Sequence, residues 1–283
     1  MPNPDASPRT EYAAAVESLA GRVLGALRGA GDAVVVARQV EQAPDPKAAL
    51  AAVRVLGPDV FAPALLAGAP FGPDDVQAVT ESFRVFPPAP DAAPEAVWRD
   101  RTTAHLLARY TGGSPEDLPA ALGVPARPAA GDRGLTAPEP RPGPGPGGAD
   151  GAWRAWSLRM AQLSPLALPG VDGPVHAAAL RRTRDLARGT GRAMLRRDHP
   201  TAARLVRWLA LAVHRGDRPA LDVAAVVRHI ELHGGSDART ALDTEVARRL
   251  ADVPGAPGVP GPPAGPGAPD APDTPERPGG PTA

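Results

Sequence analysis

Five arginines in the second half of the chain recur at the spacing of a single helix face. They lie three or four residues apart, which confines them to an arc of roughly 120° along an edge about 22 Å long. A row of like charges repels itself and favours a negatively charged counterpart. The sequence therefore predicts a partner- or anion-binding edge formed by Arg181, Arg184, Arg188, Arg192 and Arg196.

Three counterparts fit such an edge. The first is an acidic protein surface, and the second is the acidic first part of this same chain. The third is a nucleic acid, because arginine neutralises phosphates and releases their counterions. Trp153 and Trp156 stand at the start of the same region and are candidate anchors for a partner, since tryptophan is enriched in binding hot spots. The alternative without a binding role is a solvated helix face.

The charge distribution supports the binding hypothesis. Residues 153–218 hold 13 arginines and four aspartates, a net charge of +9, whereas residues 1–152 carry −5 and residues 219–283 carry −4. The whole chain has a formal net charge of zero. Lys47 is the only lysine, and the abundance of Ala, Gly, Pro and Arg is typical of a GC-rich bacterial genome, so part of the arginine content reflects codon bias.

A second pattern has the spacing of a metal-binding helix. His229 and His233 are four residues apart and share one helix face. The glutamate between them, Glu231, occupies the third position and not the second as in the zincin motif. No third ligand adjoins the pair in sequence, so the fold would have to bring Asp222 or His214 close to it. An imidazolium at position 233 also suits a helix C-terminus. A metal-dependent enzyme is therefore only the third functional hypothesis, and we expect no cofactor.

Other catalytic patterns are missing from the sequence. The chain has no cysteine, which excludes thiolate nucleophiles and thiolate metal sites, and no serine lies in a G-x-S-x-G motif. The N-terminal residues do not resemble a signal peptide, and no uninterrupted apolar run is long enough to cross a bilayer. We therefore expect a cytoplasmic, non-enzymatic interaction or accessory protein, with a nucleic-acid-binding regulator as the alternative and no role at a membrane.

Proline and glycine divide the chain. With 38 prolines and 31 glycines in 283 residues, they concentrate in two stretches that cannot bury enough apolar surface to fold. We predict an all-α protein with two small helical blocks at 7–124 and 153–253. A Pro/Gly linker at 125–152 joins them, and residues 1–6 and the tail 254–283 are predicted to be disordered. Whether the two blocks pack together is left open.

Apolar residues recur with helical periodicity in both blocks, and no convincing alternating strand pattern occurs. The arginine row is predicted to lie on one helix at 174–198, in which Gly189 and Gly191 each cost about 1 kcal/mol relative to alanine and weaken the middle. The next helix, at 200–215, is apolar almost all round and should form the buried centre of its block. The remaining helices are expected at about 8–29, 34–42, 46–56, 58–67, 73–86, 93–110, 151–163, 221–233 and 237–252.

Overall fold

The computed structural model describes residues 8–30, 35–114, 116–128 and 148–252. Within these ranges every regular element is a helix and no strand occurs, so the chain is all-α, as predicted. The predicted N-terminal segment 1–6, residues 129–147 of the predicted linker and the predicted tail 254–283 lie outside the described residues.

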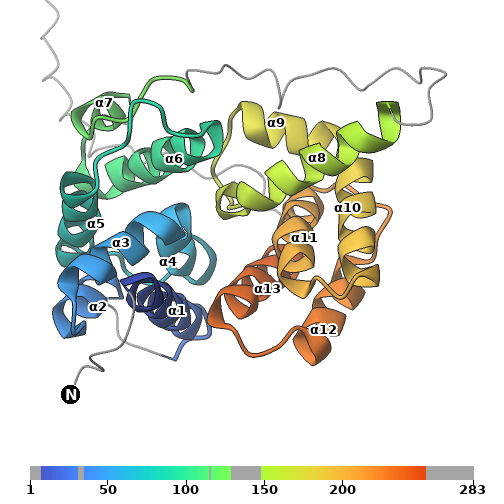
Figure 1. Cartoon of the computed structure of the whole chain (residues 1–283), viewed down its shortest axis with the longest axis horizontal. Coiled ribbons are helices and arrows are strands. Elements are labelled where there is room, and N and C mark those ends of the chain that lie inside the picture. The colour runs from blue at the N-terminus through green and yellow to red at the C-terminus, as the bar shows by residue number, and fades with distance from the viewer. Residues whose placement is uncertain (1–7, 31–34, 115, 129–147, 253–283) are drawn as a thin grey trace, which may run out of the picture.

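The first half forms the left side of the molecule in Figure 1. Its long helices, α1 and α6, are joined by shorter elements that follow the predicted pieces closely. The elements are α1 (Pro8–Leu27), α2 (Val36–Gln42), α3 (Pro46–Leu56), the 3-10 helix η1 (Gly57–Phe61), α4 (Ala62–Ala67), α5 (Pro73–Val85), α6 (Pro94–Thr111) and α7 (Asp117–Ala121).

The second half lies beside the first, and α13 runs next to α1 at the centre of Figure 1. The first helix of this half begins at Gly148, inside the stretch predicted to be linker. The elements are α8 (Gly148–Gln162), the 3-10 helix η2 (Ser164–Leu166), α9 (Pro174–Arg181), α10 (Thr183–Leu195), α11 (His199–His214), α12 (Val223–His233) and α13 (Ala238–Asp252).

Aspartates cap several of these helices and fix where they begin. The side chains of Asp45, Asp198 and Asp222 each accept a hydrogen bond from a backbone N–H in the first turn of α3, α11 and α12. Asp75 does the same across the fold: although it belongs to α5, it accepts bonds of 2.8 and 2.9 Å from the first two N–H groups of α2. The two helices are thereby held in a fixed relation.

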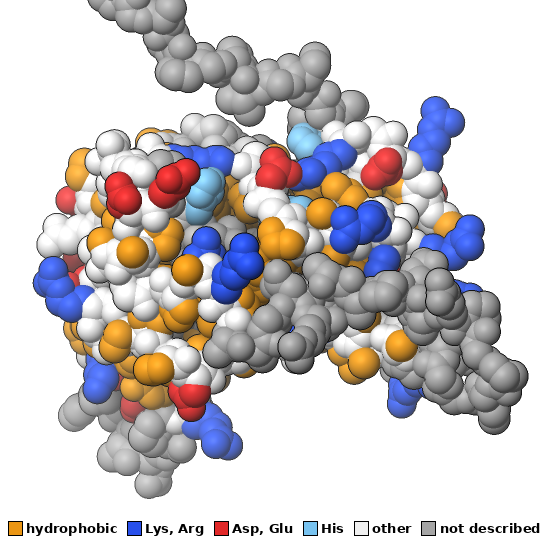
Figure 2. Space-filling model, turned by 90° about the horizontal axis from the view of Figure 1, so that it is seen from above, with side chains coloured by type: hydrophobic (Ala, Val, Ile, Leu, Met, Phe, Trp, Pro, Cys, Tyr) orange, Lys and Arg blue, Asp and Glu red, His pale blue; other side chains and the backbone are white. Residues whose placement is uncertain are grey.

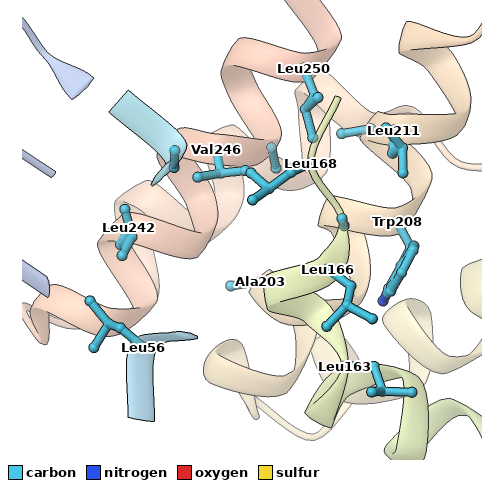
Figure 3. Packing of buried hydrophobic residues seen from close by; sticks show 14 of the residues in the cluster. Leu56, Leu163, Leu166, Leu168, Ala203, Trp208, Leu211, Leu242, Val246 and Leu250 are labelled. Carbon is cyan, nitrogen blue, oxygen red and sulfur yellow. The ribbon is translucent and has the colours of Figure 1, made fainter. Parts of the chain in front are cut away.

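A single hydrophobic core serves both halves, which answers the question that the sequence leaves open. Helix α11 lies at its centre, as its apolar sequence predicts, and packs against α8, α10, α12 and α13. Figure 3 shows Leu56 of the first half approaching Leu242 of α13, with Trp208 further along the same cluster. The Trp208 ring is 1% exposed and its Nε1 donates to the Met160 carbonyl at 2.9 Å.

A buried charged cluster also joins the halves. Arg207 of α11 is fully buried and donates to Asp59 of η1 and to Asp243 of α13, each at 2.6 Å. Arg239 adds a second cation at 3.1 Å from Asp59. Burial on its own would lower the pKa of Arg207, but the two carboxylates outweigh it and raise that pKa, so the guanidinium stays charged. The two carboxylates are thus neutralised by these two cations, and the more exposed Arg204 lies 3.8 Å from Asp243 as a third.

The apolar stretch Pro46–Ala67 is the one helical run in the described ranges with the length and hydropathy of a membrane span. It is built from α3, η1 and α4, and 67% of its most apolar window is buried inside the fold. This burial is what a core helix of the bundle requires.

The predicted single helix at 174–198 is wrong, because the chain breaks at Arg182. This residue closes α9 and precedes α10, with φ −120° and ψ 35°. Its guanidinium pairs with Asp185 at 2.7 Å and covers the Trp156 ring at 4.2 Å from the centroid. The side chain is thus held inward, and the break redirects α10 so that it packs on α8 and α11.

The two glycines predicted to weaken this region lie inside α10 without interrupting it. They differ in their surroundings. A Cβ at Gly189 would lie 2.8 Å from the Ser157 side chain and 3.1 Å from Leu205, whereas a Cβ at Gly191 would meet nothing within 4 Å. Gly189 therefore allows α8, α10 and α11 to approach closely, and Gly191 has no such role.

Candidate functional site

The break at Arg182 divides the predicted arginine row. Arg181 ends α9, while Arg184, Arg188 and Arg192 lie on α10 and Arg196 caps its C-terminal end. The opposite face of α10 is buried, so the helix is amphipathic in the predicted sense. Arg181, Arg184, Arg188 and Arg196 are exposed and Arg192 is half-buried. The edge is therefore shorter than predicted and does not include Arg181.

The C-terminal part of the row faces a cavity of about 370 Å³ between α8, α10 and the start of α11. We call this cavity the basic groove. It brings together the predicted residues Trp153, Arg192 and Arg196, although α8 and α10 are separated in the sequence. The full lining is Trp153, Arg154, Ser157, Leu158, Gly189, Arg192, Ala193, Arg196, Asp198, Thr201 and Leu205.

The two tryptophans predicted as anchors have different positions. Trp153 is half-buried and lines the basic groove, with the Arg154 guanidinium 5.5 Å from the centroid of its ring. Trp156 is only 4% exposed and packs in the core beneath the Arg182 guanidinium. Trp156 therefore offers a partner no surface, which corrects its predicted role: the core and the Arg182 side chain cover its ring.

Positive charge predominates in the groove. Three arginines line it and Asp198 is its only acidic residue, whose carboxylate already accepts a hydrogen bond from the Thr201 N–H at 3.1 Å. Apolar surface is also present: Leu158 in the lining is 58% exposed, and Leu195 at the end of α10 is 89% exposed. The groove thus combines guanidinium donors with an aromatic ring and one exposed leucine, Leu158, while Leu195 lies outside its lining. Arginine and aromatic side chains are enriched in protein-binding surfaces.

Other arginines form ion pairs with the acidic first half of the chain. Arg207 and Arg239 bind Asp59, and Arg159 of α8 forms an ion pair with Glu95 of α6. Charge complementarity between the halves therefore exists, but the residues that provide it were not predicted. The one signal in the sequence is an arginine, Arg207, inside an apolar helix. Helix α10 makes its main contacts with α8, α9 and α11, all in its own half.

The histidine pair gains a neighbour in the structure. The rings of His229 and His233 are 4.6 Å apart between centroids, and the His199 ring lies 5.9 Å from that of His229. The residues considered from the sequence as third members were Asp222 and His214, and His199 was not among them. Within the described ranges, no group of three or more histidine or carboxylate side chains is arranged to hold a metal ion.

No family model matches this chain, and no curated protein or solved structure matches it significantly.

Proposed function

We propose that this chain is a non-enzymatic, cytoplasmic binding protein that captures an acidic protein segment in the basic groove. The convergence of Trp153, Arg192 and Arg196 on one cavity carries the proposal. A segment with carboxylates and at least one large apolar side chain would fit best. Its carboxylates would pair with the guanidinium groups, and the apolar side chain would cover Trp153 and Leu158.

An acidic protein segment suits this surface better than a nucleic acid does. The cavity is concave and partly apolar, and the row of arginines is shortened by the turn at Arg182 and accompanied by Asp185 and Asp198. A nucleic-acid backbone is nevertheless the second candidate, because Arg184, Arg188, Arg192 and Arg196 follow one exposed edge. Phosphate binding of that kind would depend on the whole edge and would fall steeply with salt.

The test compares two charge reversals of equal size. Arg192→Glu with Arg196→Glu changes the groove, and Arg184→Glu with Arg188→Glu changes two exposed arginines of the same edge that lie outside its lining. The probes are a fluorescent 15-residue peptide of alternating glutamate and leucine, the same peptide with serine in place of leucine, and a labelled 20-base-pair DNA. Binding is measured by fluorescence anisotropy over a range of salt concentrations.

We expect the Glu/Leu peptide to bind more tightly than the Glu/Ser peptide, and the groove reversal to weaken it at least about tenfold while the outer reversal has little effect. DNA binding that both reversals weaken equally, with a steep salt dependence, would instead favour the nucleic-acid function. If neither peptide nor DNA binds at low salt, the proposal fails.

A further inference from the structure

A second cavity, of about 470 Å³, lies between the two halves of the molecule. Helix α6 of the first half forms one wall, and the segment from η2 to the start of α9 forms the other. We call it the seam pocket. Figure 2 looks down on this side of the molecule, where arginine and histidine side chains lie near the boundary between the halves. None of its lining residues belongs to the basic groove.

The walls of the seam pocket are held in place from both halves. Arg109 of α6 donates to the Gly170 carbonyl across the seam. Arg215 of α11 donates to the Val171 carbonyl at 3.0 Å and to the Asp172 carboxylate at 2.7 Å. Gly170 has φ +70°, and a Cβ there would lie 3.3 Å from the Arg109 guanidinium. The pocket is thus a preformed feature of the fold, as ligand sites usually are.

The chemistry of its lining is basic on one side and apolar on the other. Arg101 and Arg127 line it together with His105, which follows Arg101 by one helical turn. Arg101 also donates to the Pro125 carbonyl at 3.1 Å, and Arg127 forms no ion pair with any described residue. Asp172 is the only carboxylate in the lining, and Arg215 already pairs with it.

The apolar side of the pocket is formed by buried residues. Leu166, Val171 and Val175 line it and are each at most 3% exposed. Trp98 adds an aromatic wall, and its Nε1 is shielded from solvent although no described residue accepts its hydrogen bond. A buried indole N–H normally has an acceptor, so Trp98 contributes the face of its ring to the pocket and not its donor.

We propose that the seam pocket binds a small organic acid, with its carboxylate held by Arg101 and Arg127 and its apolar body against Trp98 and the buried aliphatic residues. The two arginines supply charge-assisted hydrogen bonds, and the volume suits an acid of one or two rings. The start of α9, where Gly173 provides no side-chain cap, adds backbone N–H groups at the edge of the pocket.

Two histidines give an independent readout of such binding. His176 lines the pocket and is 3% exposed, with its Nε2 2.8 Å from the Leu166 carbonyl. Burial lowers its pKa, and burial followed by the nearby Arg109 and Arg101 lowers that of His105. A carboxylate between these rings favours their protonated forms, so binding should raise both pKa values.

The test uses the full chain and isothermal titration calorimetry with 2-naphthoate, the uncharged 2-naphthamide and inorganic phosphate. We expect 2-naphthoate to bind, and the other two to bind at least about tenfold more weakly. Arg127→Gln should weaken 2-naphthoate binding about tenfold without changing the melting temperature. Arg101→Gln should have a similar effect on binding, while Arg181→Gln, outside the pocket, is the matched control.

The proposal would be overturned by four results. In the first, 2-naphthamide or phosphate binds as tightly as 2-naphthoate, and in the second, Arg127→Gln binds 2-naphthoate with unchanged affinity. In the third, the pKa of His176 measured by NMR does not rise in the complex. In the fourth, 2-naphthoate does not bind more tightly than about 1 mM. Failure of this test would leave the basic groove untouched, since the peptide experiment uses different residues and a different probe.

Discussion

Replacing Arg207 with methionine should destabilise the protein more than any change at an exposed ion pair. The side chain is fully buried and bonds to Asp59 and Asp243 at 2.6 Å each. Its removal leaves two buried carboxylates with Arg239, at 3.1 Å from Asp59 and 3.9 Å from Asp243, and the more exposed Arg204, at 3.8 Å from Asp243. Breaking a buried pair in this way typically costs about 3–5 kcal/mol.

Urea denaturation measures this cost. For a fold of this size the unfolding free energy changes by about 3 kcal/mol per molar urea, so Arg207→Met should lower the midpoint by roughly 1–1.7 M. Arg84→Met is the matched control, because Arg84 forms a 3.0 Å pair with Glu81 on the surface and is 77% exposed. That change should alter stability by no more than about 0.5 kcal/mol.

A combined variant separates the cost of an unpaired charge from the value of the cluster. Asp59→Leu, Asp243→Leu, Arg207→Met and Arg239→Met together remove both carboxylates and their two most buried cations, and leave Arg204, whose side chain is 39% exposed, at the edge of the cluster. This variant should be more stable than Arg207→Met alone, because no carboxylate is left buried without a partner. If Arg207→Met costs less than about 1 kcal/mol, or if the combined variant is the less stable of the two, the electrostatic reasoning is refuted.

Three further predictions concern the fold. Gly189→Ala should destabilise it by about 1–3 kcal/mol because the new methyl group meets Ser157, whereas Gly191→Ala should stabilise it by up to about 1 kcal/mol; equal effects in urea denaturation would contradict this. Asp75→Ala should cost about 1–3 kcal/mol, measured in the same way, since it leaves two N–H groups of α2 without their acceptor. Burial lowers the pKa of His176 below 6.5, so the unfolded chain binds the proton first and stability is lost as the pH falls through about 6.5. His176→Gln should therefore reduce the difference between the urea midpoints at about pH 7.5 and 5.5. An undiminished difference would refute the assignment.

The helices could be predicted from the sequence because their signals are local. Periodic apolar residues, aspartate caps and proline or glycine terminators mark nearly every element, and the central place of α11 follows from its apolar composition. The break at Arg182 could not be predicted, since this residue carries no terminator. Its conformation depends on Trp156 and Asp185, and the Trp156 contact joins it to a different helix. Periodicity therefore placed Arg181 in one row with residues that belong to another helix.

The roles of the individual arginines were less predictable than the helices. A guanidinium at position 207 pairs with a carboxylate 148 residues earlier, and no local pattern indicates which of many acidic residues is its partner. Charge segregation between the halves was visible in the sequence, and it suggested contact with the first half, but it did not indicate which arginines make that contact. Some arginines, such as Arg159 and Arg207, bind the first half, and others, such as Arg188 and Arg192, do not.

The role of Arg192 in the proposed groove can be tested with a variant that changes peptide binding without changing the stability of the fold. Arg192 stands four residues from both Arg188 and Arg196, so its charge costs about 0.4–1 kcal/mol in repulsion across two pairs. Its position in the last turn of α10 stabilises the helix by about 0.3–1 kcal/mol, because a cation there interacts favourably with the helix dipole. These contributions nearly cancel, so Arg192→Gln should leave the urea midpoint almost unchanged.

If Arg192 serves the groove, the same variant should bind the Glu/Leu peptide several-fold more weakly in the anisotropy assay. A solvated helix face predicts no change in either measurement, so unchanged peptide binding in a fully stable Arg192→Gln protein would remove this arginine from the proposed site.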